Sequence, residues 1–374
     1  MLCWVSALLF AHCKTPYDPP LKSTQTNFLV VEGFIDGAAT TKIKLSRTRI
    51  LYAGDTANRH SEINANVLIE DDHQNIYSLA DAGDGIYSNA DTLKLNPAYQ
   101  YRLHIFTSNG KEYFSDFVSY KPAPLIDNIG WKLKNNGVQI YVNTHDPNEA
   151  TMYYRWEFSE TWEFHSAYNT SLKYDVDNNA VIPRNDQVHI CWRSDNFHSV
   201  LLGSSAKLSS DVIDQAPLVY IEPHSRKLSV LYSILVKQYA LDVNGYNFWV
   251  AMKSNTEQVG SIFDPQPNQT NGNIHCTTDT SEKVVGYIGA GNTIEKRVFI
   301  NNNLMPAGWN FPEDCLIITV PLNKDSLIYY FRDGGFSPIS ETRSQTGAIG
   351  YVSSFVQCVD CTLNGTNIKP AFWP

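Results

Sequence analysis

Short segments in which apolar and polar residues alternate, each closed by a turn, run through the first third of the chain. Thr41–Ser46 and Tyr99–Ile105 alternate in this way, and the apolar segment Phe28–Ile35 ends at the turn pair Asp36-Gly37. A period of two places one face of a strand against a core and the other in water. No helical period appears before residue 120. The pattern predicts an antiparallel, immunoglobulin-like β-sandwich over residues 25–121.

A proline-rich segment, Tyr120–Pro124, separates this series from a second one. Proline has no N–H to give to a strand ladder, so we expect strands to stop there. Later, Lys227–Tyr239 alternates as a long strand, and Asp242 can cap a helix near residues 242–254. We therefore expect a mainly β protein with two sandwich domains. The second and larger domain would cover residues 122–374 and contain the helix.

The first twenty residues combine a short apolar run with a cysteine. Trp4–Ala11 is apolar and is followed by Cys13 and then by the proline-rich Lys14–Pro20. The run is too short to span a bilayer, which needs about 20 apolar residues. It is typical of the signal of a bacterial lipoprotein. It predicts a signal peptide over residues 1–12, lipid on Cys13 and a stalk over residues 13–24.

Two details depart from that pattern. His12 stands where a small residue normally precedes the lipidated cysteine, and no Lys or Arg precedes the apolar run. One hypothesis places the true start of the chain upstream of Met1. The alternative to lipidation is a buried N-terminal segment of a cytosolic protein, with Cys13 in its core. Two or more acyl chains on Cys13 would hold the protein on a membrane, outside the cytoplasm.

The composition excludes one class of partner and raises a question about the aromatic residues. The net charge is −9, which argues against nucleic acid, because nucleic acid attracts basic surfaces. Tyr alone occurs 21 times. Trp156, Trp162, Phe164 and Tyr168 are candidates for an exposed aromatic binding patch. The alternative is a single broad sheet face that is buried.

Five of the seven cysteines remain once Cys3 leaves with the signal and Cys13 carries lipid, and an odd number leaves one thiol free. Exported proteins tend to oxidise their thiols. The disulfide candidates are Cys191, Cys276, Cys315, Cys358 and Cys361.

The pairing of these cysteines stays open in the sequence. We expect Cys315 to pair with Cys358 or Cys361, because the polar C-terminal tail has little to hold it by burial alone. A Cys358–Cys361 bridge is the rival, and Cys191 and Cys276 could pair with each other. Cys358 and Cys361 could also bind a metal, but a zinc site needs a second pair at matching spacing, which the chain lacks.

Motifs of catalysis and cofactor binding are missing from the sequence. The chain has no Gly-x-Ser-x-Gly elbow, no His-Glu-x-x-His, no phosphate loop and no dinucleotide fingerprint. Asp81 begins a segment like a calcium loop, but Thr92 stands at its closing position, so we interpret Asp84-Gly85 as a turn. We expect no catalytic residue, no metal site and no cofactor.

The ordered landmarks of the chain resemble a family of Bacteroidota lipoproteins of unknown function. The landmarks are Cys13–Pro20, Leu29–Ile35, Lys44–Thr48, Asp81–Tyr87, Gln238–Leu241, Gly260–Asp264, Cys358–Thr362 and Lys369–Trp373. Genes of this family commonly lie beside TonB-dependent outer-membrane receptors. The resemblance implies a lipid-anchored outer-membrane protein, on the cell surface or the periplasmic face, that works with a transporter. It transfers no catalytic residue.

Three functions remain open from the sequence. The first is a binding or accessory module that partners a TonB-dependent receptor in nutrient uptake or assembly. The second is a secreted-side hydrolase of glycans or peptides, which would need a cleft with converging carboxylates or a metal. The third is a structural or adhesive surface protein, which needs no pocket.

Overall fold

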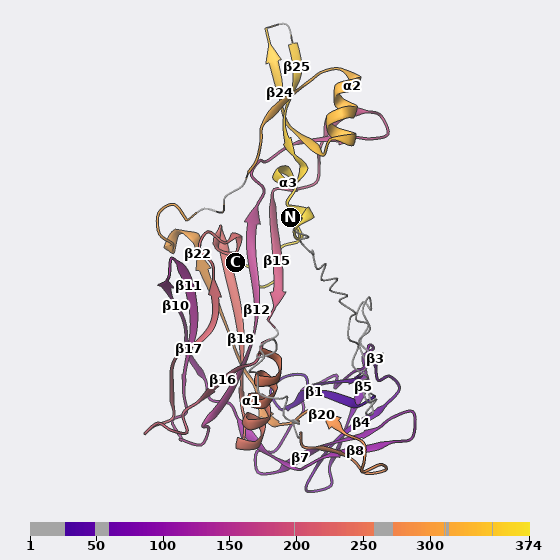
Figure 1. The fold of residues 1–374 in the computed structure, drawn as a ribbon, viewed down its shortest axis with the longest axis vertical. Helices are drawn as coiled ribbons and strands as arrows, with labels where there is room; N and C mark the ends of the chain where they lie inside the picture. Colours follow the sequence, from indigo (N-terminus) through magenta and orange to yellow (C-terminus); the bar gives the residue numbers. More distant parts are fainter. Residues whose placement is uncertain are drawn as a thin grey trace, which may run out of the picture.

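The computed structural model describes residues 27–48, 60–197, 199–257, 272–309, 311, 314–345 and 347–374. The predicted signal peptide, Cys13 and the stalk lie outside the described residues. The described chain is mainly β and contains several sheets. Figure 1 shows three units along its length, with a barrel-like unit at one end, a sandwich in the middle and a small lobe at the other end.

The barrel-like unit takes strands from two distant parts of the chain. Its N-terminal strands are β1 (Leu29–Asp36), β2 (Lys42–Arg47), β3 (His60–Ser61), β4 (Asn66–Asp71), β5 (Ile76–Asp81), β6 (Ile86–Ser88), β7 (Gln100–Phe106), β8 (Glu112–Ser115) and β9 (Val118–Pro122). Its later strands are β19 (Ile274–Cys276), β20 (Val284–Val285) and β21 (Ala290–Asn292).

Strand β21 closes this sheet into a ring. It runs parallel to both β1 and β9, and β9 also pairs with β7. The order β7-β4-β5-β6-β2-β1-β21-β9 therefore returns to its start as a ring of eight strands. This ring differs from the two facing sheets of the immunoglobulin-like sandwich that turn spacing predicts. Turn spacing identifies strands but does not fix their order in a sheet.

The proline-rich segment ends a strand, as expected, but it is not a free linker. Strand β9 ends at Pro122, and β10 (Ile126–Lys134) begins shortly afterwards. The backbone N–H of Ala123 donates to the side-chain oxygen of Asn292 at 3.0 Å. Because residues 274–292 also belong to the ring, the chain crosses between the two units more than once. The boundary predicted between residues 121 and 122 therefore does not separate two continuous segments.

Two sheets pack against each other in the middle unit. One contains β10, β11 (Gly137–His145) and β17 (Val212–Ile221), and the other contains β12 (Tyr153–His165), β15 (Ile190–Asn196), β16 (Leu201–Ser204), β18 (Leu231–Ala240) and β22 (Ile294–Asn301). Side chains from both sheets share one buried cluster. The short helices η1 (Arg226–Leu228) and η2 (Asn302–Leu304) flank it.

Helix α1 (Val243–Glu257) follows β18 and confirms the predicted helix. The Asp242 carboxylate accepts the backbone N–H of Gly245 at 2.6 Å, which is the predicted cap. Trp249, on this helix, packs with Tyr246 against a small cluster around Tyr239 and Leu241.

The small lobe is built from the C-terminal region and one earlier hairpin. It contains β23 (Ile318–Pro321), β24 (Phe336–Ser344), β25 (Gly347–Phe355), α2 (Lys324–Leu327), the π-helix η3 (Ile328–Asp333) and the hairpin of β13 (Leu172–Asp175) and β14 (Ala180–Pro183). Its core contains Val320, Leu327, Phe331 and Tyr351. After β25 the chain continues through α3 (Val356–Val359) and η4 (Cys361–Leu363).

Two disulfides fasten the C-terminal region. Cys315 pairs with Cys358, which confirms the pairing expected for Cys315. Cys191 on β15 pairs with Cys361, so its suggested pairing with Cys276 is wrong. Cys276 is buried in the ring unit as a free thiol, in agreement with the odd number of cysteines.

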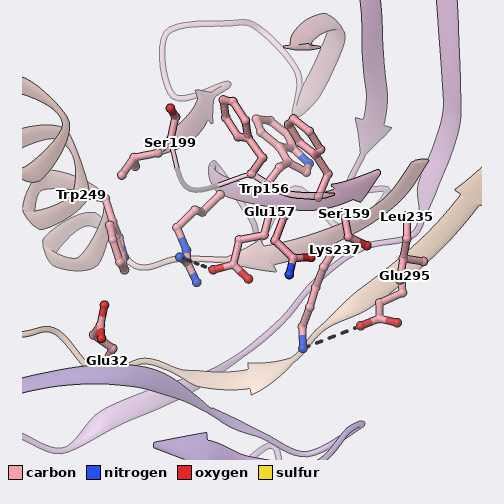
Figure 2. A pocket seen from close by; sticks show the side chains of 14 residues that line it. Glu32, Trp156, Glu157, Ser159, Ser199, Leu235, Lys237, Trp249 and Glu295 are labelled. Carbon is pink, nitrogen blue, oxygen red and sulfur yellow. Dashed lines mark hydrogen bonds and ion pairs between the residues drawn. The ribbon is translucent and has the colours of Figure 1, made fainter. Parts of the chain in front are cut away.

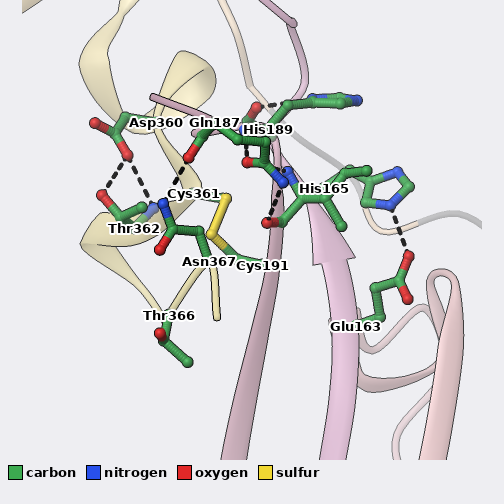
Figure 3. Close-up of a disulfide and its surroundings, with 12 residues drawn as sticks. Glu163, His165, Gln187, His189, Cys191, Asp360, Cys361, Thr362, Thr366 and Asn367 are labelled. Atoms are coloured by element: carbon green, nitrogen blue, oxygen red, sulfur yellow. Dashed lines mark hydrogen bonds and ion pairs between the residues drawn. A yellow bond between two sulfur atoms is a disulfide. The ribbon is translucent and has the colours of Figure 1, made fainter. Parts of the chain in front are cut away.

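Hydrogen bonds also hold the C-terminal tail around the Cys191–Cys361 bridge (Figure 3). The Asp360 carboxylate accepts the backbone N–H of Thr362, and the Asn367 side chain donates to the Gln187 carbonyl. Trp373 is buried and donates to Glu163 at 2.9 Å. The tail is therefore held by burial as well as by disulfides, more firmly than its polar composition suggests.

Candidate functional site

A hollow of about 480 Å³ lies where β12, β18, helix α1 and strand β1 meet (Figure 2). Its floor is the face of the larger sheet that points away from the sandwich core. Alternation along each strand places Arg155 and Glu157 of β12 on this face. Their cross-strand partners on β18 are Tyr239 and Lys237, respectively. We call it the junction hollow.

Arg155 is held rigidly at one side of the junction hollow. Its guanidinium carbon lies 4.1 Å from the ring centroid of Tyr239 and 4.3 Å from that of Trp249. Its Nη1 donates to Glu157 at 2.7 Å. Arg155 Nε is buried and has no hydrogen-bond partner among the residues that the structure describes. The guanidinium therefore keeps hydrogen-bonding capacity that the described protein groups do not use.

Tyr239 and Glu157 form a second contact in this cluster. The Tyr239 hydroxyl donates to the other carboxylate oxygen of Glu157 at 2.6 Å. Burial raises the pKa of Tyr239 far above its ordinary value, and the negative charge of Glu157 adds to the effect. The hydroxyl consequently stays protonated at neutral pH and remains a donor.

Lys237 connects the sandwich to the ring unit on the far side of the hollow. Its Nζ lies 3.6 Å from Asp36 of β1 and 3.8 Å from Glu295 of β22. Figure 2 shows this Lys237–Glu295 pair and, on the side that β1 contributes, the Glu32 carboxylate. Glu32 is exposed, and its carboxylate has no ion-pair or hydrogen-bond partner among the described residues.

The lining of the junction hollow is suited to binding. It offers donors from Arg155 and Lys237, acceptors from Glu32 and Glu295, and the aromatic side chain of Trp249. The described residues that line it include no histidine and no cysteine. Convergent polar groups beside an aromatic side chain are the arrangement in which pockets orient ligands.

Trp156 is the one aromatic residue singled out from the sequence that also lines the junction hollow (Figure 2). Trp156, Trp162 and Phe164 are buried in the sandwich core, so the hypothesis of an exposed patch is wrong for them and the buried sheet face is correct. The reason is that even-numbered residues of β12 face the opposite sheet. Tyr168 is half-buried, and its hydroxyl donates to the Cys315 carbonyl at 3.2 Å.

A second hollow, of about 810 Å³, opens between the sandwich and the lobe, beside the Cys315–Cys358 bridge. Trp162 contributes to it and lies beneath Lys227 Nζ, 5.1 Å from the ring centroid. Lys227 also forms an ion pair with the buried Glu160 at 2.6 Å. Arg193 and Arg226 also line this hollow, so it too offers cations beside aromatic side chains.

One acidic cluster has metal-ligating side chains close together. Atoms of Asp71, Asp72 and His73 lie within 4.8 Å of one another. Asp71 already accepts the backbone N–H groups of His73 and Asn75, each at 2.9 Å. These bonds are those of an aspartate-stabilised turn, which accounts for the cluster. Asp84 has a positive φ of 52°, and Asp81 accepts the Gly83 N–H, consistent with the turn predicted there.

Sequence reasoning missed the residues of the junction hollow. Arg155 and Glu157 alternate with Trp156, and this signal places them on the face opposite the core. Trp249 lies within the helix predicted near residues 242–254, and the sequence pattern does not place it beside β12. Bringing these residues together needs the register of β12 with β18 and the position of α1, which the sequence pattern does not supply.

Comparison with known proteins bears on the family of the chain. No helix among the described residues combines the length and the apolar character that crossing a bilayer requires. No curated protein gives a significant match. One family model matches residues 14–297, which is more than half of the chain. The chain therefore belongs to the family described as a domain of unknown function, DUF4249.

Proposed function

We propose that the protein is a binding module, anchored to the outer membrane by lipid on Cys13, that assists a TonB-dependent receptor in nutrient uptake or assembly. The observation that carries this proposal is the pair of disulfides, Cys191–Cys361 and Cys315–Cys358. Disulfides persist in oxidising compartments outside the cytoplasm. They agree with the lipoprotein pattern around Cys13.

The family match adds support for the anchor. It starts at residue 14, directly after Cys13, so the apolar run lies outside the conserved domain, where a cleaved signal would lie. The junction hollow supports the binding role, because it presents fixed donors and acceptors on the surface where two units meet.

Cross-linking in intact cells tests the partnership. The full-length protein, carrying a C-terminal affinity tag, is cross-linked, purified from solubilised membranes and analysed by mass spectrometry. We expect a TonB-dependent receptor to be enriched over a sample from cells that express an unrelated tagged lipoprotein. Recovery of the protein without any receptor would contradict the proposed partnership.

A further inference from the structure

We infer that the junction hollow binds a neutral, polyhydroxylated ligand, that is, a segment of an uncharged glycan. This inference deepens the proposed function and rests on it, since it names the class of ligand that the binding module would take. The argument starts from the charges of the lining, continues with its donors and acceptors, and ends with its aromatic wall.

Four of the five charged side chains that line the hollow pair with an opposite charge, and only the Glu32 carboxylate is unpaired among the described residues. Arg155 is paired with Glu157 at 2.7 Å, and Lys237 lies between Asp36 and Glu295 at 3.6 and 3.8 Å. Glu32 therefore leaves one carboxylate in excess, and an anionic ligand would be repelled, because like charges at close range repel. An uncharged ligand meets no such penalty.

The lining also keeps both donors and acceptors available. Lys237 makes only ion-pair contacts longer than 3.5 Å, and Arg155 Nε has no acceptor among the described residues. The Glu32 carboxylate accepts no hydrogen bond from any described residue. Lys237 is partly exposed, so a ligand oxygen that enters the hollow can accept a hydrogen bond from its Nζ. Hydroxyl groups both donate and accept, and a polyol can therefore satisfy cations and carboxylates together.

Trp249 supplies the apolar part of the site. It stands on α1 at the wall of the hollow and is only partly buried. The Arg155 guanidinium covers one face of this ring, 4.3 Å from its centroid, and the remaining ring surface is left for the C–H groups of a sugar, whose hydroxyls reach polar groups at the edge. A volume of about 480 Å³ lies within the range of roughly 300–1,000 Å³ that is usual for small-molecule sites.

Affinity electrophoresis tests the inference with defined probes. The full chain is run in native gels that contain neutral polysaccharides (starch, xylan, β-glucan, mannan) or acidic ones (polygalacturonate, alginate). Isothermal titration calorimetry with oligosaccharides of the retained polymer then gives Kd. We expect at least one neutral polymer to retard the protein, and we expect the retardation to persist at 0.5 M NaCl, because screening weakens contacts between exposed charges but not hydroxyl contacts.

Two variants and one matched control locate the binding. Glu32→Ala should weaken binding about tenfold, the equivalent of one lost hydrogen bond to a charged group, with the melting temperature unchanged because Glu32 is exposed and unpaired among the described residues. Trp249→Ala should weaken it further. Tyr329→Ala removes an aromatic side chain that is 66% exposed on the lobe and should bind as the unchanged protein does.

Three results would overturn the inference: no retardation by any of the neutral polymers, retardation only by acidic polymers that salt abolishes, or equal affinity in Glu32→Ala and Tyr329→Ala. The receptor cross-link provides a separate readout. If glycan binding fails while the receptor is still recovered, the ligand class is wrong and the partnership stands. If the receptor is not recovered but glycan binding remains, the partnership is wrong and the ligand class stands.

Discussion

At the scale of single residues, one carboxylate joins the two distant parts of the ring unit. Glu282 accepts from Tyr113 at 2.7 Å and pairs with Arg47 at 2.8 Å, and it also pairs with Lys111. Its side chain is 6% exposed. Arg47, Lys111 and Tyr113 come from the N-terminal strands and their turns, whereas Glu282 precedes β20. The cluster therefore fastens the late strands to the early ones.

Replacing this carboxylate should destabilise the protein. Glu282→Ala removes one of the two carboxylate partners of Arg47, which keeps Glu62 at 2.6 Å, and it also removes the acceptor of the Tyr113 hydroxyl. We expect a loss of roughly 1–3 kcal/mol. Urea denaturation at pH 7 measures the change. Glu341→Ala is the matched control, because its partner Arg343 has a side chain that is 73% exposed, and exposed pairs contribute under about 1 kcal/mol. Equal losses in the two variants would contradict the role of Glu282.

The same residue predicts a dependence on pH. Burial alone would raise the pKa of Glu282, but hydrogen bonds from Lys111, Tyr113 and Arg47 outweigh it and lower the pKa below its ordinary value of 4.5. A depressed pKa stabilises the folded state fully above the pKa of the unfolded chain, and this stabilisation is lost as pH falls through the folded pKa. We expect the free energy of unfolding to fall below about pH 4.5, and to fall less steeply in Glu282→Ala. If the free energy of unfolding falls equally steeply with pH in the unchanged protein and in Glu282→Ala, Glu282 is not a source of the pH dependence.

At the scale of elements, each disulfide should contribute stability that rises only slowly with the length of the loop it closes. Cys315 and Cys358 are 43 residues apart and Cys191 and Cys361 are 170 apart. The chain-entropy model assigns about 4 and about 5 kcal/mol to loops of these lengths. The double replacement Cys315→Ser, Cys358→Ser should therefore lower the free energy of unfolding by up to about 4 kcal/mol, and denaturation in guanidinium chloride measures it.

Peptide mapping checks the connectivity without any substitution. In a non-reduced digest of exported protein, we expect the pairs Cys191–Cys361 and Cys315–Cys358. Cys276 should react with a thiol reagent only after unfolding, because it is buried. A peptide that carries Cys315 as a free thiol would contradict the assignment.

Sequence patterns predicted the positions of individual strands and of the helix better than they predicted any other feature of the structure. Alternation located strands such as β2, β7 and β18 because a period of two is a local property, and Asp242 located α1 because a cap is local as well. The identity of the partner strands was beyond these patterns. The contact of β1 with β21 joins residues about 250 positions apart, and nothing in either short segment specifies the other.

The same limit explains what was missed in the candidate site. The period of β12 already assigned its even-numbered aromatic residues to one face, and that face became the core. The junction hollow instead uses the odd-numbered face, together with α1 and β1. Its residues come from separate elements and become neighbours only when the units are assembled.

At the scale of the whole molecule, closure of the ring predicts that the N-terminal region cannot fold alone. Ile274, Ile288 and Ala290 lie in the same buried cluster as the N-terminal strands. A fragment of residues 27–121 lacks them and leaves β1 and β9 without β21. We expect it to show no cooperative thermal transition by circular dichroism, while the full chain does. Cooperative unfolding of the fragment would show that the ring is not required.

A substitution in the full chain tests the same closure. A Cβ added at Gly291 would lie 2.0 Å from the carbonyl oxygen of Lys121, between β21 and β9. Gly291→Ala should therefore force the strands apart and destabilise the protein by roughly 1–3 kcal/mol. Urea denaturation checks this, and an unchanged midpoint would mean that the two strands are not packed closely.

The proposed lipid anchor on Cys13 is tested at the scale of the whole molecule as well. Each buried methylene of an acyl chain contributes about 0.8 kcal/mol to membrane binding, so two or three chains on Cys13 would make attachment stable. We expect Cys13→Ala, introduced into the full-length precursor, to move the protein from the membrane fraction to the soluble fraction. Cys3→Ala is the matched control, since it changes a cysteine within the apolar signal and leaves the acceptor in place, and it should fractionate as the unchanged precursor does. Metabolic labelling with an alkyne fatty acid should mark the unchanged protein and the Cys3→Ala variant only. If Cys13→Ala stays in the membrane fraction, attachment must come from another part of the chain or from a partner, and the lipid anchor is wrong.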